Sequence, residues 1–185
     1  MDHLDHRILS ALRVYGCDPR VAGAARALSW AGEHGALWLA AGLAGAAVDG
    51  ARRGAWVRGT ALTAGAHLVS MGVKRVVRRP RPAHVEPLVR TAGRHSFPSS
   101  HAASAAAAAV AFGMLATRRG GGSGSTTAPL ATTATRVTLP PLATAMCLSR
   151  LVVGVHYPSD VAAGAALGAL TACAGARWMR GGADD

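Results

Sequence analysis

Three short clusters contain the residues whose types and spacing could do chemistry. Residues 74–82 read KRVVRRPRP, residues 97–101 read FPSSH, and residues 149–160 read SRLVVGVHYPSD. Each cluster stands at the end of a long apolar stretch. Together they offer two histidines, one carboxylate, several cations and five hydroxyl groups, and such a set can bind an anion and move protons around it.

The third cluster contains the sharpest signal, because His156 is followed by Asp160 four residues later. A histidine that attacks as a nucleophile or shuttles a proton needs a carboxylate to fix its tautomer and stabilise its charged form. Asp160 comes just after a Tyr-Pro turn and starts the last apolar helix, so it could reach back to His156. An aspartate at a helix start is also an ordinary cap. The full pattern, Arg150 followed after five residues by His156 and after three more by Asp160, is expected by chance in about one chain of this length in a thousand.

The other two clusters are less specific when each is taken alone. Pro98 and Ser99 are typical of a helix start, which leaves free N–H groups and the positive end of the helix dipole near His101 and so favours phosphate binding. Taken alone, this motif is more often simple capping beside an incidental histidine than a phosphate site. Lys74 and Arg81 follow an apolar helix, where a basic run is more often a head-group anchor than a catalytic site.

Five apolar stretches must position these clusters: residues 35–48, 57–77, 102–117, 137–155 and 161–176. A bilayer core needs roughly 20 mostly apolar residues. We therefore predict an all-α fold, a polytopic membrane bundle of about five transmembrane helices, in which alanine and glycine let the backbones approach closely. A soluble alanine-rich bundle is the alternative. If the five spans alternate in direction, all three clusters reach the same membrane face.

The rest of the chain suggests flanking segments rather than a second globular domain. Residues 1–33 have apolar positions at helical spacing, interrupted near residues 17–19, and predict amphipathic helices on the membrane interface. Residues 34–180 would form the transmembrane domain and residues 181–185 a tail. A Gly/Ser/Thr stretch at 120–127 predicts a flexible loop.

The composition excludes several classes of protein. The formal net charge is +11, yet only 4% of residues are aromatic, which removes the stacking platform of a single-strand nucleic-acid binder. Basic residues lie in the connections between apolar stretches, a pattern that favours a phospholipid bilayer and phosphorylated lipids as partners and no nucleic acid. The three cysteines are far apart and indicate neither a disulfide framework nor a metal site.

In these three clusters, the chain resembles the type 2 phosphatidic acid phosphatase superfamily, and the resemblance covers about residues 56–178. The three clusters look like its signature: Lys-x6-Arg-Pro at 74–82, Pro-Ser-Gly-His at 98–101 and Ser-Arg-x5-His-x3-Asp at 149–160. Ser100 stands where the family usually has glycine. Arg79-Pro80 is a competing Arg-Pro pair, but only Arg81 has the six-residue spacing from Lys74.

The resemblance implies a role for each residue. His156 would attack phosphorus, Asp160 would orient its ring, and His101 would protonate the leaving oxygen. The phosphoryl oxygens would be bound by cations and by the start of the helix, that is by Lys74, Arg81, Arg150, Ser99 and the backbone of Ser100. No metal and no other cofactor is implied.

The resemblance also implies an integral, multi-pass protein of a bacterial plasma membrane that acts in cell-envelope biogenesis. Its substrate would be a lipid phosphate, with polyprenyl carriers such as decaprenylphosphoryl-5-phosphoribose or undecaprenyl diphosphate favoured over phosphatidylglycerol phosphate and phosphatidic acid. A vanadium haloperoxidase and a non-catalytic lipid-binding membrane protein are the rival classes. The sequence leaves open the oligomeric state and the membrane face that carries the site.

Overall fold

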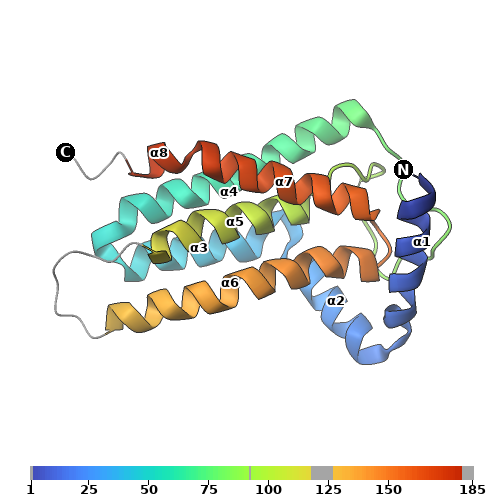
Figure 1. Ribbon diagram of the computed structural model, residues 1–185, viewed down its shortest axis with the longest axis horizontal. Coiled ribbons are helices and arrows are strands. Elements are labelled where there is room, and N and C mark those ends of the chain that lie inside the picture. Colours follow the sequence, from blue (N-terminus) through green and yellow to red (C-terminus); the bar gives the residue numbers. More distant parts are fainter. Residues whose placement is uncertain (1, 92, 118–126, 181–185) are drawn as a thin grey trace.

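Every regular element of the computed structural model is a helix within residues 2–91, 93–117 and 127–180, which are the residues that the structure describes (Figure 1). The predicted all-α class is therefore confirmed. The helices run in chain order as α1 Asp2–Arg13, α2 Pro19–Ala31, α3 Ala36–Val48, α4 Arg53–Val77, α5 Ser100–Thr117, α6 Thr127–Val152, α7 Pro158–Ala174 and α8 Ala176–Arg180, with short 3-10 turns at Val14–Cys17, Glu33–Gly35 and Gly50–Arg52.

The five predicted apolar stretches correspond to α3, α4, α5, α6 and α7. The largest difference within the site region is at the end of α6, which stops at Val152, so residues 153–155 belong to the turn that leads to His156. Residues 120–126 of the predicted loop and the predicted tail at 181–185 lie outside the described residues, and α6 begins at the last loop position, Thr127.

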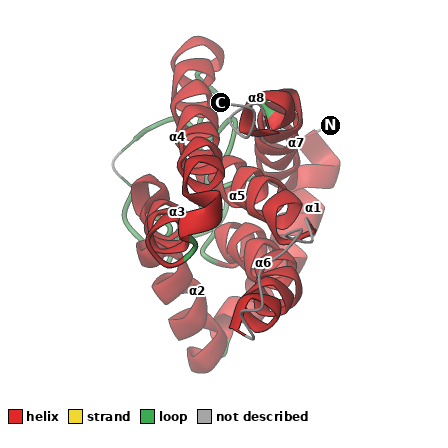
Figure 2. Cartoon of the chain, turned by 90° about the vertical axis from the view of Figure 1, so that its left-hand side faces the viewer, coloured by secondary structure: helices red, strands yellow, loops and turns green. Residues whose placement is uncertain are grey.

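Helix α5 lies at the centre of the bundle, with α3, α4, α6 and α7 around it (Figure 2). Alanines with no exposed surface make up much of α5: Ala102, Ala103, Ala105, Ala107, Ala108 and Ala111. Phe112 adds a ring near its far end and contacts Trp56 of α4, with 5.2 Å between the ring centroids. This central helix begins at the second chemical cluster, so its packing fixes where that cluster lies.

Two glycines of α7 allow it to approach α5 backbone to backbone. A methyl group on Gly168 would lie 2.8 Å from the carbonyl carbon of Ala103 and 3.0 Å from the amide nitrogen of Ala107. A methyl group on Gly164 would lie 3.2 Å from the backbone nitrogen of Ser99. All three distances are shorter than an ordinary van der Waals contact. Because these two glycines have no side chain, α7, which contains Asp160, packs closely against α5, which contains His101.

The outer faces of the bundle expose large apolar side chains. Leu43 of α3, Leu68 of α4 and Leu170 of α7 are 59%, 66% and 68% exposed. None of the helices in the described part of the chain combines sufficient length with sufficient mean hydropathy to qualify as a membrane-spanning segment.

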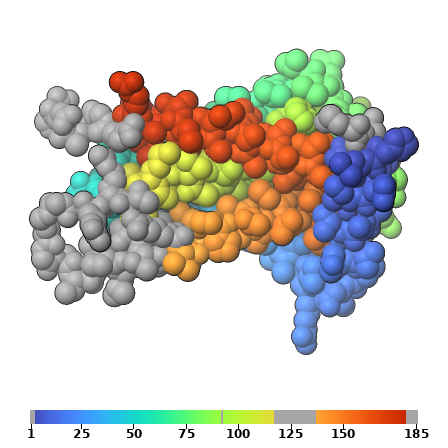
Figure 3. Space-filling model, viewed as in Figure 1, coloured from blue at the N-terminus to red at the C-terminus, as the bar shows by residue number. Residues whose placement is uncertain are grey.

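The two N-terminal helices cover one end of the bundle, drawn in blue in Figure 3. The predicted interruption near residues 17–19 is confirmed, because α2 begins at Pro19 and the side chain of Asp18 caps it by accepting the N–H of Arg20 at 2.7 Å. On α1, Leu9 and Asp5 are buried, whereas Leu4 is 63% exposed. The inward face of α1 therefore contains a carboxylate, at the same end of the bundle as the three clusters.

Candidate functional site

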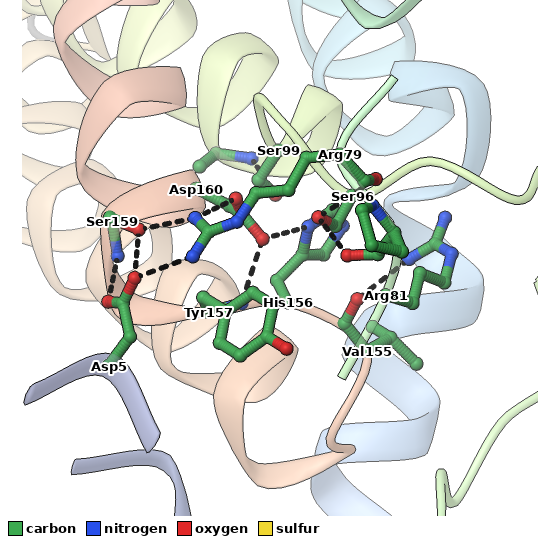
Figure 4. Close-up of polar contacts among 12 residues, drawn as sticks. Asp5, Arg79, Arg81, Ser96, Ser99, Val155, His156, Tyr157, Ser159 and Asp160 are labelled. Atoms are coloured by element: carbon green, nitrogen blue, oxygen red, sulfur yellow. Dashed lines mark hydrogen bonds and ion pairs between the residues drawn. The ribbon is translucent and has the colours of Figure 1, made fainter. Parts of the chain in front are cut away.

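The turn between α6 and α7 positions the histidine and the carboxylate. Gly154, with φ +75°, supplies the left-handed residue that lets the chain reverse after α6. His156 follows in the turn, and Asp160 stands in the first turn of α7, where its Oδ2 accepts the N–H of Tyr157 at 2.8 Å. The Nδ1 atom of His156 lies 3.6 Å from the same oxygen, and the exposed fractions of the two side chains are 2% and 0% (Figure 4).

Burial and nearby cations keep the His156 ring neutral. Burial lowers the pKa of His156 to about 3; the Arg150, Arg81 and Lys74 charges act in the same direction, and Asp160 opposes them. Although burial alone would raise the pKa of Asp160, its hydrogen bonds hold that pKa below the ordinary value. A neutral ring whose Nδ1 faces a carboxylate has its Nε2 lone pair free to attack.

Three cations gather around His156. Arg150, in the last turn of α6, is buried, and its Nε has no hydrogen-bond partner among the described residues. Arg81 is held by two carbonyl oxygens, since its Nη1 donates to Val155 and its Nε to Gly93, each at 2.8 Å. Lys74, in the last turn of α4, is close enough to Arg81, Arg150 and Asp160 to interact with their charges. An anion bound here would compensate this positive charge and supply a partner for the buried guanidinium.

The start of α5 is tied directly to the start of α7. The backbone N–H of Ser99 donates to the backbone oxygen of Asp160 at 2.9 Å. The hydroxyl oxygen of Ser99 accepts the N–H of Ala102 at 3.4 Å, so it caps the helix and keeps its own proton for donation. Ser100, the next residue, is the first residue of α5 and is buried.

His101 faces the other side of the same end. Its Nε2 contacts the carbonyl oxygen of Ser29, in α2, at 3.0 Å, so in the neutral ring this nitrogen carries the proton. Burial lowers the pKa of His101 to about 3, and the charge of Arg150 adds to the effect. Nδ1 is therefore the nitrogen left to exchange a proton with a bound molecule. The three clusters form one site, and all eight predicted residues lie at this end of the bundle: Lys74, Arg81, Ser99, Ser100, His101, Arg150, His156 and Asp160.

Comparisons with known proteins identify the family of the chain. The family model described as PAP2 superfamily matches residues 55–182. The chain belongs to the PAP2 superfamily.

Its curated relatives are phosphatases, which confirms that the chain is a phosphoric monoester hydrolase, as its resemblance to the type 2 phosphatidic acid phosphatase superfamily implied. The chain is 44% identical over 148 residues to the decaprenylphosphoryl-5-phosphoribose phosphatase of Mycolicibacterium smegmatis, covering 79% of this chain and 72% of that protein. It is 42% identical over 153 residues to the phosphatase of the same name from Mycobacterium tuberculosis, covering 82% and 76%.

The fold has a solved counterpart as well. The crystal structure titled the first transmembrane PAP2 type phosphatidylglycerolphosphate phosphatase, from Bacillus subtilis, matches with a TM-score of 0.56. The match covers 97% of this chain and 78% of that one at 17% identity, so it supports the fold alone.

The structure adds residues to this candidate site that the sequence motifs do not include. Arg79, the competing Arg-Pro position, contacts Asp160 directly, while Arg81 lies beside the backbone of Val155. Asp5 and Ser29 come from the N-terminal helices, far outside the three clusters. The second Arg-Pro pair was a visible signal for Arg79. Asp5 offered only its helical register with Leu9, and a backbone carbonyl such as that of Ser29 gives no signal in a sequence.

Proposed function

We propose that this PAP2 phosphatase removes phosphate from a polyprenyl-linked phosphomonoester in a membrane, with decaprenylphosphoryl-5-phosphoribose as the first candidate substrate. The observation that carries the proposal is the neutral, buried His156, backed by Asp160 and surrounded by three cations. The names of the curated relatives support the substrate class.

The proposed reaction has two steps and leaves the enzyme unchanged. In the first, Nε2 of His156 forms a bond to phosphorus as the ester P–O bond breaks, and the leaving oxygen takes a proton from His101. In the second, water attacks the phosphohistidine, His101 takes the proton of this water, and the P–N bond breaks to release phosphate. Asp160 stabilises the positive charge that His156 gains between the two steps.

The cations and the start of α5 would serve the phosphoryl oxygens. Lys74, Arg81 and Arg150, with Ser99 and the backbone N–H of Ser100, bind negative charge that is spread over three equatorial oxygens. The same negative charge opposes the field of Arg150 at His101 and so favours the protonated ring that the first step needs.

We further propose that residues 34–180 form a multi-pass domain in the bacterial plasma membrane, with α1 and α2 on its interface. The exposed leucines of α3, α4 and α7 support a lipid environment around the bundle. In this arrangement the site opens at one end of the helices, where a lipid phosphate group would lie.

Purified protein in detergent tests the proposal. We expect phosphate release from decaprenylphosphoryl-5-phosphoribose, in the presence of EDTA, to exceed release from undecaprenyl diphosphate and phosphatidic acid. His156→Gln should lower this release at least 1,000-fold, an order of magnitude expected for loss of a nucleophile. His3→Gln, at an exposed position on α1, is the matched control and should keep full activity. Equal release by the wild type and His156→Gln would refute the histidine mechanism.

A further inference from the structure

The guanidinium of Arg79 joins two buried carboxylates from opposite ends of the chain (Figure 4). Its Nη1 donates to Oδ1 of Asp160 at 2.9 Å, and its Nη2 donates to Oδ2 of Asp5 at 2.9 Å. Asp160 has no exposed surface and Asp5 is 5% exposed. Because a guanidinium is planar and its N–H groups have fixed directions, it holds the two carboxylates in a fixed relation.

Asp5 also contacts the first turn of α7. Its Oδ1 accepts the backbone N–H of Ser159 at 3.0 Å, and its Oδ2 accepts the hydroxyl of the same serine. The N–H groups of a first turn have no partner within their own helix, and a negative charge is stabilised there. Burial alone would raise the pKa of Asp5, but the bonds from Ser159 and Arg79 outweigh it and lower the pKa. Asp5 is therefore ionised at neutral pH.

The bond from Arg79 also decides which oxygen of Asp160 faces the histidine. Oδ1 is taken by Arg79, whereas Oδ2 accepts the N–H of Tyr157 and is the atom 3.6 Å from Nδ1 of His156. With both oxygens assigned, the carboxylate cannot rotate without breaking a charge-assisted bond. Arg79 thus orients the group that orients His156.

The charges of the three groups matter as much as their geometry. Asp5, Arg79 and Asp160 together carry one net negative charge, and in the proposed mechanism His156 becomes positive while it holds the phosphoryl group. Without the charge of Asp5, the positive charge of Arg79 would fall on Asp160 alone and cancel the negative charge that Asp160 offers to His156. The positive charge that His156 gains would then be buried without a balancing negative charge, which raises the free energy of that state. The step that forms the phosphohistidine would therefore slow.

We propose that Asp5 is a positioning residue of this enzyme, which holds Arg79 so that Asp160 keeps both its orientation and its charge toward His156. The proposal rests on the proposed phosphohistidine mechanism. It assigns a part in the reaction to α1, which lies before residue 55, where the PAP2 match begins.

Variants at Asp5 and Arg79 test this role in the full-length enzyme. Asp5→Asn keeps the size of the side chain and removes its charge. We expect it to lower kcat about tenfold, the effect of losing one hydrogen bond to a charged group, and to change KM less than about threefold. Asp5→Glu should recover part of the loss. In an Arg79→Met background, Asp5→Asn should change kcat less than about twofold. Asp18→Asn is the matched control, because asparagine caps α2 as well as aspartate does.

Binding of orthovanadate gives a second readout that needs no turnover. Orthovanadate bound at His156 would mimic the geometry of the transferring phosphoryl group, so Asp5→Asn should weaken its binding about tenfold and Asp18→Asn should not. Wild-type kcat and vanadate affinity in Asp5→Asn would overturn the positioning role. An equal loss of kcat with and without Arg79 would overturn it too, since Asp5 would then act by another route. If the wild type released no phosphate, the proposed function would fail, and vanadate binding would still decide on Asp5.

Discussion

Gly168 offers the most direct way to test whether α5 and α7 position the site. A methyl group at this position would lie 2.8 Å from the carbonyl carbon of Ala103, where carbon atoms normally stay about 3.5 Å apart or more. The atoms that this methyl group would meet, in Ala103 and Ala107, belong to the backbone of α5 and cannot move without shifting the helix. We therefore expect Gly168→Ala to push α7 away from α5 by about 1 Å.

That displacement would also move the reacting groups. The start of α7 contains Asp160, whose backbone oxygen accepts the N–H of Ser99 at 2.9 Å. Moving the two helix starts apart by about 1 Å breaks this bond and separates His156 from the start of α5. Misplacement by about 1 Å costs on the order of 100-fold in rate. Overpacking of the interface also costs about 1–3 kcal/mol of stability.

Phosphate release and thermal unfolding in detergent measure the two effects side by side. Gly65→Ala is the matched control, because this glycine lies within α4 and an added methyl group meets nothing within 4 Å. It should keep the wild-type rate and gain about 0.5–1 kcal/mol of stability from helix propensity. If Gly168→Ala had the activity and the unfolding midpoint of the wild type, the close packing of α5 and α7 would not be what holds the site together.

Two further predictions concern stability rather than catalysis. The pKa of both His101 and His156 in the folded protein is about 3, below the usual 6.5. As the pH falls below 6.5, the unfolded chain therefore binds protons at these rings that the folded protein does not bind, which favours unfolding. Each ring should therefore lower the free energy of unfolding by about 2 kcal/mol at pH 5 relative to pH 7.5. The thermal unfolding midpoint should decrease from pH 7.5 to pH 5. A decrease of the same size in His156→Gln would contradict the assignment for that ring. At the opposite end of the bundle, Asp49 accepts hydrogen bonds from Arg52 and from the indole of Trp56 at 3.1 Å. Asp49→Asn should lower stability by about 1–2 kcal/mol and leave kcat unchanged, and a large fall in phosphate release would show that the two ends are coupled.

The long elements and the three clusters could be predicted because their signals are local in the sequence. The five apolar stretches predicted the helices α3 to α7. The Pro-Ser and Tyr-Pro pairs predicted where α5 and α7 begin to within about three residues. The eight predicted site residues lie at the end of each apolar stretch, and antiparallel packing then brings those ends together.

The supporting contacts could not be predicted, because they join residues far apart in the chain. Arg79 meets Asp160 across 81 positions, and Ser159 meets Asp5 across 154. No periodicity or spacing rule connects such pairs, since each depends on how whole helices cross. The buried face of α1 also differs from its apolar residues: Leu4 and Asp5 are neighbours, yet the leucine is exposed and the aspartate is buried.

The crowding around α5 limits how such an enzyme can diversify. Six of its alanines have no exposed surface, so a larger residue at any of them displaces a neighbouring helix together with the reacting groups attached to it. New substrate preferences must then arise elsewhere, in the 78–99 connection and in the N-terminal helices that border the site. A laboratory library aimed at altered lipid specificity should randomise those two regions while keeping Asp5, Arg79, Arg81 and Ser99, and should leave the central helix untouched.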